Sequence, residues 1–493
     1  MSEEHEGRAR AHTLRRLRQR ALSLGGANAF DYVTQFLLPV VLARALDTLA
    51  FGQYRLLWLA ARTASSIAPL AMPASLYYFL PRSDGDTRRL YVNQTLFFLA
   101  VTGLISGWAV SSWNPWLPQS MQALEEHGAI VPTFVALWIA ASLLDMLPAI
   151  EERVAWQTRV IIGLAVLRTV ALSLAAIITH DLAAVLIVMI AFVLLRLGLL
   201  GVYVARYHGL RGPILRWKAF VGQVKHATPF GAAGALYDLR AQADQWIAAT
   251  LFSLHLFAAF SVGAVIGTLV SIFRKSVNTA FLPSMSKLEA GGDLRGMLEL
   301  NSRANAMVAA LVCPLAALAF VFAEEVVTLV YTEAYIGAAP VMRVYIIGLL
   351  ALIVELASIT LLLRQGPFVV RVNIAALVIA VPVSWFAAKY YGLAGAAVGS
   401  VIAIYLDRLV TLKHISRLSG VPMRRLQDWS ALASLLGYAV VAAALGWWIT
   451  ASYFGASPPF IRLLVGGATL GAAYFTLLGL ANLCNGLALV TRR

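Results

Sequence analysis

Charged and amide side chains lie within apolar stretches of this sequence, and their types suit ligand binding rather than covalent chemistry. In the stretch GALYDLRAQADQWIAATL, Arg240 and Asp244 are four positions apart and can pair on one helical face. Asp238, Gln242 and Gln245 follow at spacings of four and three, which predicts a second polar stripe on the same helix. A guanidinium can bind an anion such as a phosphate, which makes Arg240 a candidate anion ligand, and the two carboxylates are candidates for binding a cation.

A shorter polar stripe occupies the first apolar stretch. Asn28, Asp31 and Gln35 are spaced by three and four residues and therefore share one face of a helix. Asp31 is a candidate site for a coupling proton or sodium ion. The alternative is that these side chains form a hydrogen-bonded contact between helices.

Arg168 and Arg196 are the deepest cations, and Arg196 lies near the middle of its apolar stretch. A lone charge at the centre of a membrane helix costs about 2.5–3.5 kcal/mol, so such residues face a cavity or a partner. One reading has both arginines bind a pyrophosphate or an acidic sugar. The other pairs them with a membrane acid such as Asp31 or Asp145.

For three further charged residues, the sequence is compatible with either a binding role or a structural role. Arg62 shares its apolar stretch with two prolines, which predict a bent helix that either gates a cavity or is a static kink. Arg274 could receive a pyrophosphate or act as an interfacial positive charge. Glu355 could bind a coupling ion or be a packed, protonated carboxyl.

Signatures of catalysis are missing from the sequence. It contains no GxxxxGK[ST] phosphate-binding loop, so we expect no nucleotide-driven pump. The longest predicted external loop, 113–129, has no Lys or Arg and little room for a catalytic domain. We therefore predict that the protein is not an enzyme, and that it has no cofactor or metal beyond a coupling H⁺ or Na⁺.

The surroundings of these polar residues are strongly apolar. Hydrophobic residues make up 60% of the 493 positions and charged residues 13%, against roughly 45–50% and 25% in soluble domains. Stretches of about twenty apolar residues match the thickness of a bilayer core and predict membrane-spanning helices. Fourteen are predicted, near 21–43, 56–80, 91–112, 130–150, 155–179, 182–205, 228–251, 256–275, 304–323, 341–363, 367–388, 393–412, 429–452 and 460–482.

The distribution of positive charge predicts the topology. Of the 39 Lys and Arg residues, 30 lie on one predicted side, 5 on the other and 4 inside spans. The basic side is normally cytoplasmic, so both termini are expected there. This also accounts for most of the net charge of +15 without a nucleic-acid partner.

We predict that the fourteen spans divide into two groups of six and a final pair. FGQY (51–54) resembles FAAF (257–260), and FLPR (79–82) resembles FLPS (281–284), which indicates a parallel internal repeat. The basic stretch 206–226 has an apolar face suited to an amphipathic helix on the membrane surface. The predicted parts are a basic cytoplasmic tail 1–20, an N-lobe 21–205, a linker 206–226, a C-lobe 227–412, a basic linker 413–428, and two helices with a short tail 429–493.

Three stretches resemble a known family in serial order. They are LARALDTLAFGQY with LAMPASLYYFLPR, then ADQWIAATLFSLHLFAAFSVGA, then the run from FLPSMSKLEAGG through residue 350. This order is similar to the Wzx-type polysaccharide flippases, whose superfamily includes multidrug and toxin extruders and the lipid II flippase. The resemblance covers the first twelve spans. It implies an all-α polytopic protein with two six-helix lobes in a V around a central cavity that opens alternately to each side.

The same resemblance implies the cargo, a polyprenyl-pyrophosphate-linked oligosaccharide moved to the periplasmic leaflet of a bacterial inner membrane. We expect a monomer with cation or potential coupling, in contact with membrane lipids and with polysaccharide polymerase machinery. Two alternatives remain at this stage. One is a cation-coupled multidrug or small-molecule antiporter, which predicts an acid-lined lumen. The other is a membrane glycosyltransferase or polymerase, which predicts catalytic residues on a long external loop.

Overall fold

The computed structural model describes residues 2–209 and 212–484, with side chains described from residue 24 to 481 apart from 210–211, 268–273, 275–276 and 279. Within these residues the chain forms helices and no strands. The chain divides into two compact units, residues 1–239 and 240–493. The predicted tail beyond residue 484, and the side chains of the predicted basic tail 1–20, lie outside the described residues.

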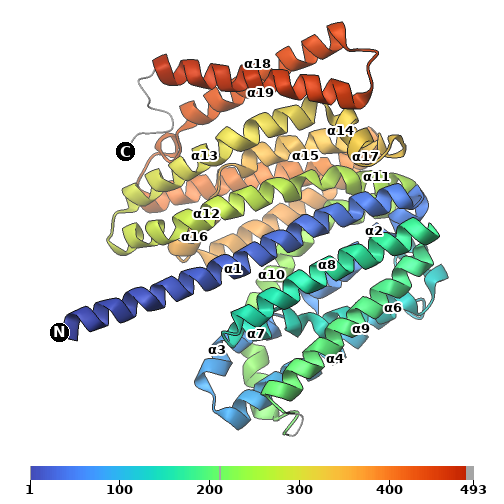
Figure 1. Cartoon of the computed structure of the whole chain (residues 1–493), viewed down its shortest axis with the longest axis vertical. Coiled ribbons are helices and arrows are strands. Elements are labelled where there is room, and N and C mark those ends of the chain that lie inside the picture. The colour runs from blue at the N-terminus through green and yellow to red at the C-terminus, as the bar shows by residue number, and fades with distance from the viewer. Residues whose placement is uncertain (1, 210–211, 485–493) are drawn as a thin grey trace. The chain divides into compact units, whose positions relative to one another are not determined.

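The first unit contains the helices that carry the predicted polar residues Asn28, Asp31, Gln35, Arg168 and Arg196, and Figure 1 shows these helices. Its elements are α1 (Ser2–Ala45), α2 (Thr48–Ile67), α3 (Met72–Phe79), η1 (Leu80–Arg82), α4 (Gly85–Ala109), α5 (Gln119–Gln122), η2 (Glu125–His127), α6 (Ile130–Ala140), η3 (Ala141–Asp145), α7 (Leu147–Ile150), α8 (Val154–Thr179), α9 (Leu182–Tyr207) and the first part of α10 (Trp217–Leu251).

The second unit begins inside α10. Its further elements are α11 (Leu254–Ala264), α12 (Ile266–Ala290), α13 (Leu294–Val321), α14 (Ala323–Val330), η4 (Glu333–Tyr335), α15 (Ala338–Leu352), α16 (Ala357–Leu362), α17 (Gly366–Ser419), η5 (Met423–Arg425), α18 (Trp429–Tyr453) and α19 (Pro459–Cys484).

The predicted all-α polytopic fold is confirmed. Each of the fourteen predicted spans falls on one helix or on successive helical elements, and eight described segments are individually long and apolar enough to cross a bilayer. Large apolar side chains such as Leu104, Ile178 and Val378 remain about two-thirds or more exposed, as a lipid-facing surface requires. The chain is a multi-pass membrane protein.

Several spans are interrupted where polar residues lie. The predicted span 56–80 is α2 and α3, separated at Leu70 and Ala71, whose φ values of 44° and 56° are left-handed. The span 341–363 is α15 and α16, separated by a non-helical stretch that includes Glu355. The span 130–150 changes from α6 to the 3-10 helix η3. Such breaks expose backbone groups that side chains must satisfy.

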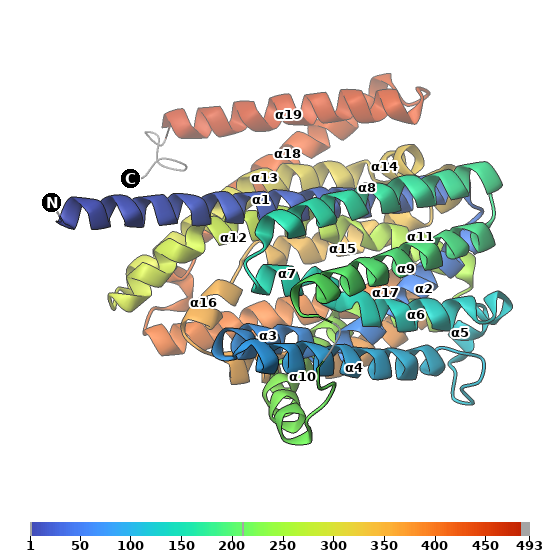
Figure 2. The ribbon, with the colours of Figure 1, turned by 60° about the horizontal axis from the view of Figure 1, so that its bottom comes forward.

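Small residues allow the helices of the first unit to approach closely. A Cβ added at Gly103 or Gly107 of α4 would lie 2.6 or 2.7 Å from a backbone oxygen of α6, so neither position tolerates a side chain. α1 lies along α8, and α9 packs against both α6 and α8 (Figure 2). These contacts bring α1, α6, α8 and α9 around one polar region.

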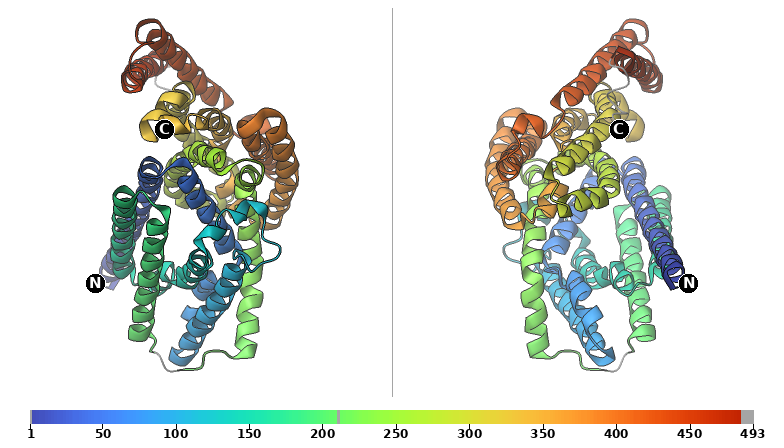
Figure 3. Two further views of the ribbon diagram at one scale, coloured as in Figure 1. Left: turned by 90° about the vertical axis from the view of Figure 1, so that its right-hand side faces the viewer. Right: turned by 90° about the vertical axis from the view of Figure 1, so that its left-hand side faces the viewer.

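The second unit packs α18 and α19 as a hairpin beside α13 (Figure 3). The hydroxyl of Tyr474 donates to the carbonyl of Ala310 at 3.0 Å, and Gly466 lies directly against the ring of Phe322. Another hairpin is formed within α17, where Gly392 (φ 66°, ψ −147°) turns the chain between two predicted spans. Only glycine adopts this backbone conformation readily.

α10 joins two segments that the sequence predicts separately. The end of the predicted linker 206–226 and the whole seventh span form this one helix, and the unit boundary lies between Leu239 and Arg240. In the first unit, the buried Gln223 of α10 donates to Ser75 and Thr95 at 2.9 Å and accepts from Gln94 at 2.6 Å. The predicted lobe boundaries remain a prediction.

Candidate functional site

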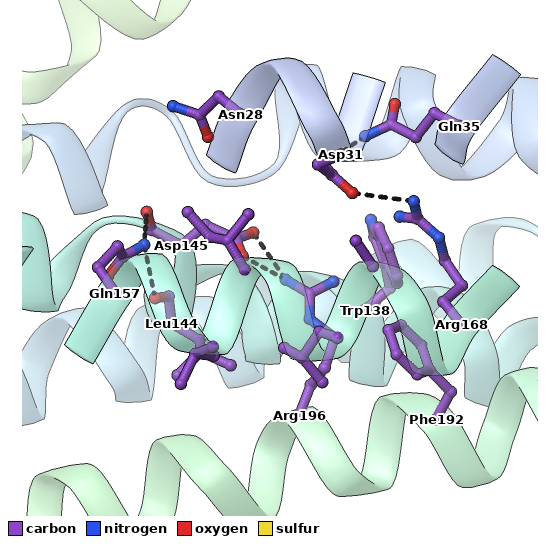
Figure 4. Close-up of a pocket in the computed structure, with 14 residues that line it drawn as sticks. Asn28, Asp31, Gln35, Trp138, Leu144, Asp145, Gln157, Arg168, Phe192 and Arg196 are labelled. Carbon is purple, nitrogen blue, oxygen red and sulfur yellow. Dashed lines mark hydrogen bonds and ion pairs between the residues drawn. The ribbon is translucent and has the colours of Figure 1, made fainter. Parts of the chain in front are cut away.

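A polar cavity of about 210 Å³ opens among α1, η3, α8 and α9 of the first unit (Figure 4). Charged residues from all four elements line it: Asp31, Asp145, Arg168 and Arg196. Asn28, Gln35 and Gln157 add amides, and Trp138 and Phe192 add aromatic rings. The structure thus gathers seven polar side chains from four sequence-distant segments within membrane-spanning helices.

One side of the cavity is an ion pair between α1 and α8. Arg168 Nη2 lies 2.9 Å from Asp31 Oδ1, and it also donates to Thr34 Oγ1 at 3.2 Å. The other carboxylate oxygen of Asp31 accepts from Gln35 Nε2 at 2.7 Å. The Arg168 side chain is 11% exposed and that of Asp31 27%. A guanidinium at this depth needs such a partner to offset its lost hydration.

A second ion pair crosses from α9 to η3. Arg196 Nη2 lies 2.7 and 2.6 Å from the two oxygens of Asp145, and the guanidinium carbon is 4.4 Å from the centre of the Trp138 ring. The Arg196 side chain is 6% exposed, whereas that of Asp145 is 59% exposed. The buried member of the pair is therefore the cation, and Asp145 presents its carboxylate toward the cavity.

Gln157 supports the break at which Asp145 lies, and the sequence did not single it out. Its Nε2 donates to the carbonyl of Asp145 at 2.7 Å, where η3 ends just before α7 (Leu147–Ile150). Gln157 is 2% exposed. In the sequence, a single amide beside a predicted cytoplasmic loop is typical of an ordinary interfacial residue. Its contact with the carbonyl of Asp145 becomes apparent only in the folded structure.

The structure pairs both deep arginines with membrane acids, and ligand binding by them remains a prediction. Arg168 and Arg196 pair with Asp31 and Asp145, the two acids weighed as partners, and all four residues line the cavity. The four formal charges cancel. The cavity is therefore polar but carries no uncompensated arginine at rest, and an anion that enters must compete with a carboxylate.

The remaining predicted residues of the first unit lie near the break in the second span. Arg62 is exposed on α2 and close enough to Asp238 of α10 to interact with it electrostatically. The predicted bend is present between α2 and α3, and Gly231 of α10 lies directly against the backbone of Leu70 there. A side chain at Gly231 would displace this contact.

In the second unit the structure brings Arg274 and Glu355 together. Arg274 Nη1 lies 3.1 Å from Glu355 Oε2, and both side chains are largely buried. The other carboxylate oxygen accepts from the backbone N–H of Ala357 at 2.8 Å, across the break between α15 and α16. The sequence predicts each residue separately and gives no sign of the pair.

Three buried amides that the sequence analysis did not single out hold this break. Asn301 Nδ2 donates to the carbonyl of Glu355 at 3.1 Å, and Asn305 Oδ1 accepts from its N–H at 3.2 Å. Gln427 joins both asparagines, accepting from Asn305 at 3.0 Å and donating to Asn301 at 3.2 Å. We call Asn301, Asn305 and Gln427 the amide hub. It satisfies backbone groups that the interrupted helix exposes.

Apart from Asp238, the predicted polar residues of the seventh span lie at the start of the second unit. Asp244 is 2% exposed and accepts from the hydroxyl of Tyr345 at 2.7 Å and from the N–H of Gln245 at 2.7 Å. Gln242 is also buried, while Arg240 and Gln245 are partly exposed. Pairing of Arg240 with Asp244 remains a prediction.

The fold and this site define a class, polytopic membrane proteins with polar, charge-bearing cavities inside their helical units. The family model described as "Polysaccharide biosynthesis protein" matches residues 41–340. The chain belongs to that family. A search of curated protein sequences found no match.

Solved structures share the fold over most of the chain. The lipid II flippase MurJ in an inward closed conformation has a TM-score of 0.69 at 11% identity, covering 93% of this chain and 98% of that one. A Vibrio cholerae MATE transporter has a TM-score of 0.54 at 10% identity, covering 84% and 98%. An outward-facing multidrug resistance MATE transporter of the MOP superfamily has a TM-score of 0.53 at 12% identity, covering 82% and 96%. These structures are described as a flippase and transporters, and the likeness confirms the predicted fold.

Proposed function

We propose that the protein is a flippase for a polyprenyl-pyrophosphate-linked oligosaccharide repeat unit. It would move the cargo from the cytoplasmic to the periplasmic leaflet of a bacterial inner membrane for surface or exopolysaccharide synthesis. The observation that carries the proposal is the polar cavity inside the membrane helices of a polysaccharide-biosynthesis family member. The fold shared with a lipid II flippase supports it. No covalent bond is made or broken.

The physical task is to move a hydrated headgroup across about 30 Å of hydrocarbon while the prenyl tail stays in lipid. Polar side chains replace the water that the headgroup loses, and alternating access keeps the path closed to ions. Arg62, Arg168, Arg196, Arg240 and Arg274 are the proposed ligands of the pyrophosphate and glycan. In this scheme both termini face the cytoplasm, where most Lys and Arg residues are predicted.

The ion pairs suggest how transport is coupled. Arg168 is held by Asp31 at 2.9 Å, so a phosphate gains this guanidinium only when the carboxylate is neutralised. A proton or sodium ion on Asp31 would do so, because it removes the charge that attracts the arginine. Asp238, Asp244 and Glu355 are the other proposed coupling carboxylates. Glu355 forms the same kind of ion pair with Arg274, at 3.1 Å.

The proposed protein works as a monomer in contact with membrane lipids and delivers its product to polysaccharide polymerase machinery. The test is translocation by the purified protein in proteoliposomes, with a fluorescent polyprenyl-pyrophosphate glycan and a membrane-impermeant quencher. We expect protein-dependent exchange between leaflets. A folded protein that leaves the labelled lipid in its original leaflet would overturn the proposal.

A cation-coupled antiporter is the second candidate, since MATE transporters share the fold. It needs a cavity of net negative charge that attracts lipophilic cations. The charges that line the first-unit cavity cancel instead, so they provide no net attraction for a cation.

A further inference from the structure

Arg408 is a largely covered cation of the second unit that the sequence analysis did not single out. It lies on α17, four residues before the end of the predicted membrane span 393–412. Its side chain is only 14% exposed. A charged side chain near the end of a span normally extends to the membrane surface or meets a partner, because its lost hydration is costly. What lies around the covered guanidinium of Arg408 therefore indicates its role.

Two contacts show that Arg408 lies on the face of α17 that packs against the interrupted tenth span. Three residues earlier in α17, the hydroxyl of Tyr405 donates to the carbonyl of Ile347 in α15 at 2.9 Å. Four residues later, Leu412 belongs to the same buried cluster as Leu356, which lies in the break between α15 and α16. Residues spaced by three and four share one face of a helix, so Arg408 faces this break.

Two further arginines of the second unit lie near Arg408. Arg274 of α12 and Arg240 of α10 are close enough to Arg408 to interact with it electrostatically, and so is Glu355 at the break. Guanidiniums from three helices therefore approach one region of the second unit. Like charges repel more strongly where water is partly excluded, so this region favours the entry of negative charge.

The two carboxylates nearby leave room for an anion at Arg408. Glu355 is already held by Arg274 at 3.1 Å and by the backbone N–H of Ala357 at 2.8 Å. Asp407 precedes Arg408 in the chain, and its Oδ2 lies 3.7 Å from Arg408 Nη1. That distance exceeds the roughly 2.7–2.9 Å of a charge-assisted hydrogen bond, and successive residues of a helix do not face each other. Among the described residues, no carboxylate therefore lies within hydrogen-bonding distance of Arg408.

The ligand chemistry that suits this region is that of a pyrophosphate. A guanidinium binds phosphate oxygens through parallel N–H donors. Two linked phosphates carry several negative charges and many acceptor oxygens, so one pyrophosphate can contact more than one guanidinium. At Arg168 and Arg196 an anion must compete with a carboxylate 2.9 Å away or closer, whereas the ion pair of Arg408 is much looser. Arg408 is therefore the easier arginine for an anion to reach.

We propose that Arg408 is a ligand of the cargo's pyrophosphate, in a group with Arg240 and Arg274 that receives the headgroup first. This inference rests on the proposed flippase function and adds to it a binding residue and an order of events. Arg274 and Arg408 lie one and four residues from the predicted cytoplasmic ends of their spans, about 2 and 6 Å along a helix. The proposed cargo starts from that side of the membrane.

The test is lipid binding by the purified full-length protein, measured by native mass spectrometry. Polyprenyl pyrophosphate and phosphatidylglycerol, an anionic phospholipid with a single phosphate, are titrated separately. The variants are Arg408→Gln, which removes the charge, and Arg408→Lys, which keeps the charge without the planar guanidinium. Arg417→Gln is the matched control, since Arg417 is an exposed arginine on the same helix.

Arg408→Gln should weaken binding of the pyrophosphate lipid about tenfold, and Arg408→Lys about threefold. Both variants should leave phosphatidylglycerol binding unchanged within about twofold, and Arg417→Gln should leave the binding of both lipids unchanged within the same limit. Unchanged binding of the pyrophosphate lipid by Arg408→Gln would overturn the inference. An equal loss for both lipids would overturn it too, because the site would then take any anionic lipid. If Arg408→Gln does not fold, Arg408→Lys decides the question.

The outcomes separate the role of Arg408 from the function on which it rests. Translocation of the glycosylated lipid by the unsubstituted protein in proteoliposomes is measured alongside. If the unsubstituted protein neither binds nor moves the pyrophosphate lipid, the flippase proposal fails, and the role of Arg408 fails with it. If it binds and moves this lipid and Arg408→Gln binds it equally tightly, the inference about Arg408 alone is wrong.

Discussion

The ion pair between Arg196 and Asp145 predicts an asymmetric response to substitution. The Arg196 side chain is 6% exposed and that of Asp145 59%, and they meet at 2.6 Å. Asp145→Asn leaves a buried guanidinium without its counter-charge. Arg196→Met leaves a carboxylate that already reaches the cavity. The first change should therefore cost more stability than the second, although each breaks the same contact.

The size of each loss of stability follows from the exposed fractions of the Arg196 and Asp145 side chains. Stranding a charge in a fully buried pair costs about 3–5 kcal/mol, and a fully exposed pair contributes about 0.2–1 kcal/mol. Because Asp145 is more than half exposed, we place Asp145→Asn between these limits, at about 2 kcal/mol. Arg196→Met should cost about 1 kcal/mol, mainly the lost contact with the Trp138 ring.

The assay is the free energy of unfolding of the purified protein in mixed micelles, measured for both single variants and the double variant. The double variant should resemble Arg196→Met, because the stranded guanidinium is then absent. This gives a coupling energy of about 1–2 kcal/mol. A larger loss for Arg196→Met than for Asp145→Asn, or additive losses, would refute the reasoning.

Three further predictions concern other parts of the chain. Burial raises the pKa of Glu151, but hydrogen bonds from His208 and Tyr203 outweigh burial and hold this pKa below its usual value. The ionised Glu151 should therefore stabilise the folded protein above about pH 4.3, and this stabilisation should be lost as the pH falls further. Melting temperatures measured over a pH series should fall less steeply in Glu151→Gln than in the unsubstituted protein. In the amide hub, Asn305→Leu should lower the free energy of unfolding by about 2–3 kcal/mol, because it leaves the buried Glu355 N–H and Gln427 Oε1 without their hydrogen-bond partner. The control is Asn373→Leu, at a half-buried amide whose hydrogen bond lies within its own helix, and it should change this free energy by under about 1 kcal/mol. Asp31→Asn should make flipping independent of an imposed pH or sodium gradient, whereas the exposed Asp86→Asn should keep the dependence; retained coupling in Asp31→Asn would remove Asp31 from that role.

The spans could be predicted because hydrophobic length is a local property. Each apolar stretch of about twenty residues satisfies its own backbone hydrogen bonds as a helix, so no distant contact is needed to recognise it. The two partners of Arg168 and Arg196 could also be named, since few acids lie at a similar depth. That these arginines do pair with the two acids depends on the neighbouring helices and required the structure, and ligand binding by them remains a prediction.

The pair of Arg274 and Glu355 could not be predicted. The two residues are far apart in sequence, and their meeting depends on an interruption of the tenth span that no proline or glycine marks at Glu355. Gln157 and the amide hub were missed for a related reason. A single amide in an apolar helix has no periodic signal, and its role as a partner for exposed backbone groups becomes visible only when the break is seen.

The central claim is that the polar cavity serves a lipid-linked glycan and not a lipophilic cation. The most direct measurement gives one proteoliposome preparation both cargoes, a fluorescent polyprenyl-pyrophosphate glycan and a fluorescent lipophilic cation, and records their transport in parallel. The account predicts leaflet exchange of the glycan lipid, slowed by Arg168→Gln, and no uptake of the cation above protein-free vesicles. Uptake of the cation with the glycan lipid left in its original leaflet would contradict it.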